Sequence, residues 1–189
     1  MLDDDVWRYL PLGPVPTLVV ATVGLAAAVH VAVVRSRVTR ALTIAMLVVT
    51  VKTILALTAR GVLSNEDGEF SWRLGETIRG EWGSVNRALG LVNIFGNVAM
   101  FVPVGWLIAV LSARRPVLVA TLAGLVFSTS TEVWQMLSGM FGDVDDILLN
   151  TLGALLGAAV AAFLKSRAVR RPEGDPDARS TGMPVEVTE

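Results

Sequence analysis

Polar side chains recur at helical spacing inside otherwise apolar sequence between residues 86 and 157. They are carboxylates and amides, which can bind a polar headgroup or a hard metal ion. A membrane-spanning segment keeps such groups only for packing or for function, because each costs free energy at membrane depth. The candidate ligand-binding residues, including one lysine from an earlier apolar segment, are Asn93, Asn97, Glu132, Gln135, Asp143, Asp145, Asp146, Asn150 and Lys52.

The composition identifies the class of protein that must position these groups. Of the 189 residues, 53% are hydrophobic and only 17% are charged, which is too apolar for an ordinary soluble domain. Lipid requires every backbone polar group to bond within its own segment. The expected fold is therefore all-α, a polytopic membrane helical bundle with about five transmembrane helices of about 20 residues each. The expected spans cover residues 16–34, 41–58, 88–111, 117–137 and 147–164.

The basic residues predict the orientation of the bundle. Arginines lie between the first and second spans and between the third and fourth, and Lys165 begins a basic stretch after the fifth. Short basic loops stay in the cytoplasm. We therefore expect a multi-pass protein of the cell membrane with an extracellular N-terminus over residues 1–15 and a disordered cytoplasmic tail over residues 165–189. In this topology the candidate residues, Lys52 included, all lie near the outer surface.

Several of these residues also have a structural interpretation. Asn93 and Asn97 are spaced to form hydrogen bonds between helices, and Lys52 is placed to be either a counter-ion for the acidic residues or a ligand contact. Small residues and a proline recur nearby, at Pro103, Gly105, Gly153 and Gly157. The proline and first glycine favour a bend in the third span. The other two glycines favour close helix packing, within one monomer or between copies in a homo-oligomer.

The order and spacing of the motifs resemble the VanZ-like family of bacterial membrane proteins. The resemblance spans roughly residues 86–160 and rests on Asn93-x3-Asn97-x3-Phe101-x-Pro103-x-Gly105, Glu132-x2-Gln135 and Asp143-x-Asp145-Asp146-x3-Asn150-x2-Gly153-x3-Gly157. The family usually has an arginine three residues before the first aspartate, where this chain has Met140. The namesake is an accessory determinant of resistance to teicoplanin, a lipid-bearing glycopeptide. The resemblance therefore implies a role at the cell envelope, with an effect on glycopeptide susceptibility.

Two functions fit these residues. The first is a non-enzymatic protein that binds a membrane lipid or another amphiphile at an outward-facing polar site, with no nucleic-acid partner. The alternative is a membrane-embedded, metal-dependent enzyme acting on a lipid-linked or phosphate-containing envelope substrate. Its divalent cation would be held by candidates Glu132, Asp143 and Asp146. We favour the first function, because no catalytic histidine, cysteine or Ser-x-x-Lys motif accompanies the carboxylates, and we expect no established cofactor.

Overall fold

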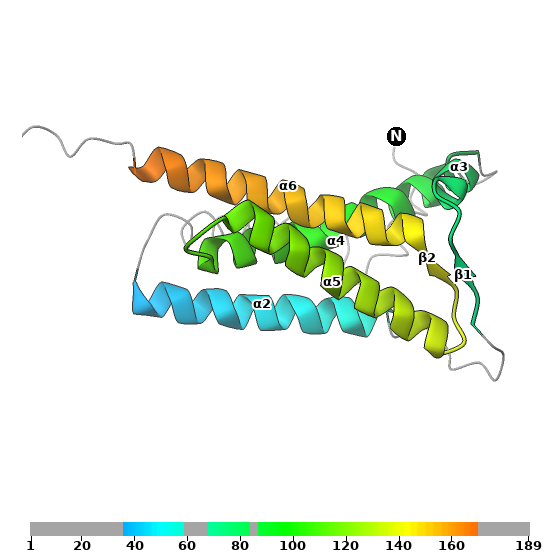
Figure 1. Ribbon diagram of the computed structural model, residues 1–189, viewed down its shortest axis with the longest axis horizontal. Helices are drawn as coiled ribbons and strands as arrows, with labels where there is room; N and C mark the ends of the chain where they lie inside the picture. The colour runs from blue at the N-terminus through cyan, green and yellow to red at the C-terminus, as the bar shows by residue number, and fades with distance from the viewer. Residues whose placement is uncertain (1–35, 59–67, 84–86, 170–189) are drawn as a thin grey trace, which may run out of the picture.

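The structure is a computed structural model that describes residues 36–58, 68–83 and 87–169. Four of its helices are long and apolar enough to cross a membrane (Figure 1). They are α2 (Arg37–Thr58), α4 (Arg87–Leu111), α5 (Pro116–Leu137) and α6 (Val144–Val169). The predicted all-α membrane bundle is confirmed. The first expected span, the N-terminal segment and the tail beyond residue 169 lie outside the described residues.

One end of the bundle carries a small cap formed by residues 68–83 and by the connection between α5 and α6 (Figure 1). The cap contains β1 (Phe70–Ser71), the eight-residue helix α3 (Glu76–Gly83) and β2 (Gly142–Asp143). The two strands pair in parallel, with Phe70 opposite Gly142. The end of the bundle that carries this cap is called the cap end below.

The chain turns sharply from α5 into α6 at the cap end. Gly139 has a φ of 76° and follows Ser138, the C-cap residue of α5, and the N–H of Met140 donates to the carbonyl of Gln135 at 2.9 Å. This left-handed glycine termination is a common helix ending. Helix α6 then begins at Val144, three residues before the expected start of the fifth span. The acidic segment is therefore largely the first turn of a helix, where negative charge is favourable.

Small residues let α4 and α6 pack with their backbones close together. A Cβ atom added at Gly105 of α4 would overlap the carbonyl of Ala154 on α6. In the same way, Cβ atoms at Gly153 and Gly157 of α6 would overlap carbonyl oxygens of α4. Three of the four residues predicted to be structural therefore form a helix contact within one monomer, and Pro103 lies inside α4.

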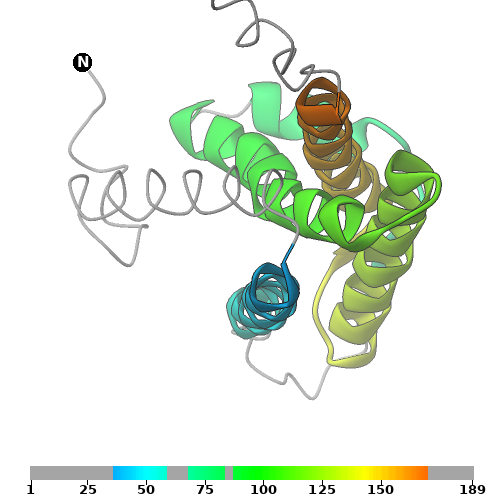
Figure 2. The same ribbon diagram turned by 90° about the vertical axis from the view of Figure 1, so that its left-hand side faces the viewer.

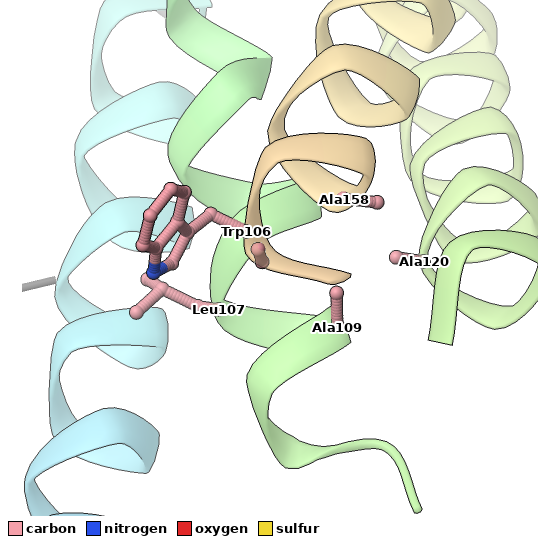
Figure 3. Close-up of a cluster of buried hydrophobic side chains, with 6 residues drawn as sticks. Trp106, Leu107, Ala109, Ala120 and Ala158 are labelled. Atoms are coloured by element: carbon pink, nitrogen blue, oxygen red, sulfur yellow. The ribbon is translucent and has the colours of Figure 1, made fainter. Parts of the chain in front are cut away.

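A cluster of buried apolar side chains lies where α4 meets α2, α5 and α6 (Figure 3). Trp106 and Leu107 point from α4 toward α2, while Ala109, Ala120 and Ala158 lie where α4, α5 and α6 come together. Viewed along the bundle, α4 lies between α2 and α6 (Figure 2). Helix α4 is thus the central element on which the other spans pack.

Lys165 fixes the opposite end of the bundle. Its Nζ donates to the carbonyl oxygens of Ala109, Val110 and Ser112 at 2.9, 2.8 and 3.3 Å. The last carbonyls of a helix have no partner within it, and a cation there also opposes the negative end of the helix dipole. Lys165, expected at the start of a disordered tail, instead lies in α6, which continues to Val169.

Candidate functional site

A pocket of about 270 Å³ lies at the cap end, between α3, α4 and α6. Three of the predicted residues, Asn93, Asn97 and Asp146, contribute to its wall. The complete lining is Thr77, Ile78, Glu81, Asn93, Ile94, Asn97, Asp146 and Leu149. This cavity, called the cap pocket below, combines polar groups from three helices with three large apolar side chains.

Two amides of α4 hold the two carboxylates of the cap pocket. The Nδ2 group of Asn97 donates to Oδ1 of Asp146, and the Nδ2 group of Asn93 donates to Oε1 of Glu81 at 3.1 Å. The two asparagines are four residues apart, so their side chains lie on one face of α4. Each amide thereby fixes one carboxylate at the edge of the cavity.

Glu81 is a site residue that sequence reasoning does not identify. It lies on α3, a helix too short to be recognised as a span, and reaches the pocket only because α3 packs over the start of α4. A Cβ added at Gly90 of α4 would overlap the backbone carbonyl of Glu81, so the two helices are in direct contact. The available signal is the spacing of Thr77, Ile78 and Glu81, which places all three on one helical face.

Asp145 positions α3 rather than lining the pocket. Its side chain is fully buried, at 0% exposure. Its Oδ1 accepts from the N–H of Gly75 at 2.7 Å, and its Oδ2 accepts from the N–H groups of Thr77 and Ile78 at 3.1 and 3.2 Å. These N–H groups begin α3 and have no partner within the helix. Hydrogen bonds to a carboxylate are stronger than neutral ones, so Asp145 is a firm attachment point for one wall of the cavity.

A second polar group connects α5 to the start of α6. Oε2 of Glu132 accepts from the N–H of Asp143 at 3.0 Å, and the amide of Gln135 faces Glu132 with its nitrogen 3.1 Å from both carboxylate oxygens. Asp143 caps α6, because its Oδ1 accepts from the N–H of Asp145 at 2.9 Å. Glu132 and Asp143 are 4% and 3% exposed, so both are buried rather than solvated.

The three candidate metal ligands do not form a ligand set in the structure. Within the described ranges, no group of three or more His, Cys, Asp or Glu side chains is placed to hold a metal ion. Glu132 and Asp143 instead each accept a hydrogen bond from a backbone N–H, while Asp146 belongs to the cap pocket. The expected single cluster is therefore divided between two places.

The remaining two predicted residues lie away from the cap pocket. Asn150 is buried between α5 and α6, where its Nδ2 donates to Oγ of Ser128 at 3.0 Å. Lys52 is exposed on α2, which is separated from α6 by α4 (Figure 2). It forms no ion pair with any carboxylate in the part of the chain that the structure describes. The structure thus does not bring Lys52 to the acidic residues.

Comparison with models of known protein families identifies the family of this chain. The family model described as VanZ/LLP1 matches residues 22–165, well over half of the chain. The chain belongs to the VanZ/LLP1 family. No curated protein and no solved structure gives a significant match. The match covers α2, α4 and α5, almost all of α6 and every residue of the cap pocket.

This VanZ/LLP1 protein concentrates negative charge at the cap end. Glu132, Asp143 and Asp146 are close enough to repel one another, and Glu81 adds to the repulsion at Asp146. Among the side chains that the structure describes, which do not include that of Arg87, no lysine or arginine forms an ion pair with any of them. Met140, three residues before Asp143, carries no charge. The described side chains of the site are therefore rich in carboxylates and in hydrogen-bond acceptors.

Proposed function

We propose that this protein is a non-enzymatic membrane protein that binds the polar headgroup of an amphiphile or envelope lipid in the cap pocket. The observation that carries the proposal is a single cavity whose wall has both polar and apolar side chains. Asp146 and Glu81 face it with their amide partners, and the apolar residues Ile78, Ile94 and Leu149 complete its wall. Five of the eight lining residues carry polar side chains, so the wall suits a polar headgroup with apolar groups beside it.

The size of the cavity supports a headgroup rather than a whole lipid. Its volume of about 270 Å³ is slightly below the range of about 300–1,000 Å³ typical of pockets that enclose a drug-sized ligand. The helices that form the pocket also expose large apolar side chains, including Val92, Phe95, Leu148 and Leu152. An acyl chain attached to a bound headgroup can pack along this surface, so both parts of an amphiphile have a place.

The distribution of basic residues supports an outward-facing pocket. The start of α2 and the connection between α4 and α5 lie at the end of the bundle opposite the cap (Figure 1). These two segments contain Arg37, Arg40, Arg114 and Arg115. Basic connections stay in the cytoplasm, so the proposal places the cap pocket at the outer leaflet. An effect on glycopeptide susceptibility then follows from binding either an envelope lipid or the lipid-bearing drug itself at that leaflet.

The proposal is tested by filling the pocket without changing its charge. Leu149→Trp and Ile94→Trp fill the cavity, whereas Leu118→Trp and Leu122→Trp change exposed side chains of α5, a helix that does not line it. Native mass spectrometry of mildly extracted protein measures the lipid that co-purifies. We expect the wild type and the two exposed variants to retain lipid and the two pocket variants to lose it.

Thermal unfolding of each variant separates loss of binding from loss of fold. Full lipid retention by both pocket variants, each with a wild-type unfolding temperature, would contradict the proposal. Two pocket positions are used, so that one misfolded variant leaves the test intact.

A further inference from the structure

We infer that the headgroup taken by the cap pocket is positively charged and donates hydrogen bonds, as an alkylammonium group does. The inference rests on the proposed function and names the chemical class of its ligand. It follows from the hydrogen-bond acceptors that the described side chains bring to the pocket, from their charge and from a buried carboxylate oxygen of the nearby Asp143.

The cap pocket offers many more acceptors than donors. A carboxylate has about four acceptor sites, and among the side chains that the structure describes, asparagine amides fill one on Glu81 and one on Asp146. The Oδ1 atoms of Asn93 and Asn97 add further acceptors. A ligand that donates several hydrogen bonds satisfies these atoms, whereas a phosphate or carboxylate headgroup would bring only more acceptors.

Charge favours the same ligand. The carboxylates of Glu81 and Asp146 lie in the pocket, and those of Glu132 and Asp143 are close enough to repel Asp146. Negative charges that are removed from water repel one another strongly, and each is costly to bury unless a positive charge pairs with it. A cation in the pocket opposes this repulsion, and an anionic headgroup increases it.

An independent observation comes from Asp143, which does not line the cavity. The residue is 3% exposed, and its Oδ2 accepts no hydrogen bond from the described part of the chain. An isolated buried carboxylate oxygen is costly to maintain. Asp143 precedes Asp146 by three residues and is close enough to repel it, so a positive charge beside Asp146 also offsets the charge of Asp143.

A free inorganic cation has the same attraction to these oxygens. The apolar residues Ile78, Ile94 and Leu149 favour the alkylammonium over the inorganic cation. They make no favourable contact with a hydrated ion, but they pack against the carbon chain of an alkylammonium. We therefore infer an ammonium group carried on an apolar chain.

The test compares two amphiphiles with one alkyl chain and opposite head charge. Dodecylammonium and dodecyl phosphate are titrated into the full chain in lipid nanodiscs, and binding is followed by native mass spectrometry. We expect dodecylammonium to bind at least about tenfold more tightly, the effect of one charge-assisted hydrogen bond. Glu81→Gln and Asp146→Asn should each reduce this preference. Glu76→Gln, which removes an exposed carboxylate of the same α3 helix, should leave it unchanged.

The outcomes separate this inference from the proposed function. Equal binding of the two amphiphiles, still blocked by Leu149→Trp, would overturn the cationic headgroup but keep the amphiphile site. If Leu149→Trp reduces the binding of neither amphiphile, the proposed function is overturned as well. Stabilisation by NaCl or MgCl₂ alone, lost in Asp146→Asn and not increased by dodecylammonium, would replace the ammonium group with an inorganic cation.

Discussion

The carboxylate of Asp145 accepts a 2.7 Å hydrogen bond from the backbone N–H of Gly75, a residue 70 positions earlier in the chain. The same side chain caps the next two available N–H groups at the start of α3. Asp145 also donates its own N–H to Asp143, the cap of α6. The starts of α3 and α6 are therefore fixed to each other, and this attachment places Glu81 at the cap pocket.

Replacement of Asp145 should release α3. In Asp145→Ala the first N–H groups of α3 lose a charged acceptor, and we expect a destabilisation of about 2–4 kcal/mol. Thermal unfolding in detergent measures this change, and the rate of tryptic cleavage after Arg79 reports the release of α3 directly. Glu76→Ala, which removes only an exposed carboxylate from the same helix, is the matched control. Cleavage of Asp145→Ala at the wild-type rate would show that α3 is held by other contacts.

The contact between α4 and α6 should tolerate no side chain at Gly105. Gly105→Ala places a methyl group against the Ala154 carbonyl, and overpacking of this kind costs about 1–3 kcal/mol or more. Gly96→Ala is the control, because a Cβ at that position of the same helix meets nothing within 4 Å. The measurement is the unfolding temperature of each variant. A drop for Gly105→Ala no larger than that for Gly96→Ala would argue against the close packing.

Loss of the Lys165 ammonium should loosen the end of the bundle opposite the cap. Lys165→Met keeps an unbranched apolar chain but leaves the carbonyls at the end of α4 without their donor. We expect a loss of about 1.5–3 kcal/mol in thermal unfolding, the range for hydrogen bonds to a charged group. Arg114→Ala removes a positive charge at the same end from an exposed side chain and should have little effect. Equal effects of the two variants would show that net charge, rather than this cap, is responsible.

The orientation can be tested with single cysteines, because the natural chain has none. Arg79→Cys lies on α3 in the cap, and Arg114→Cys lies in the connection between α4 and α5. A membrane-impermeant maleimide added to intact cells should label Arg79→Cys and should label Arg114→Cys only after permeabilisation. The reverse pattern would place the cap pocket at the cytoplasmic face and would remove the argument for an outer-leaflet ligand.

The spans were accessible from sequence because each of the four described helices contains an apolar run of membrane length. The position of each residue along its span also predicts that Asn97 of α4 and Asp146 of α6 lie at the same depth in the membrane. In the structure a hydrogen bond joins the two side chains. The residues at which the helices begin were harder to predict from the sequence. The spacing of the aspartates does not reveal that α6 begins at Val144, because that start depends on Asp143 accepting from a particular backbone N–H.

The parts of the site that sequence could not reveal depend on contacts between distant residues. Glu81 reaches the pocket because Asp145 holds α3 in place, and neither residue carries a local pattern that predicts the other. Lys52 has a suitable depth on α2, but depth does not specify the direction of a side chain around the helix. Its exposure on α2, with α4 between α2 and α6, separates it from the acidic residues.

The most direct test of the central claim is to locate a bound amphiphile on the chain. A dodecylammonium probe with a photoreactive diazirine beside its headgroup is added to the protein in nanodiscs, irradiated, and mapped by peptide mass spectrometry. The account predicts labelling of the cap-pocket walls around Ile78, Ile94 and Leu149, with competition by unlabelled dodecylammonium. A second, apolar groove of about 560 Å³ lies on the exposed face of α5 around Val126 and Val133. Labelling confined to that groove, or spread evenly over the spans, would contradict the account.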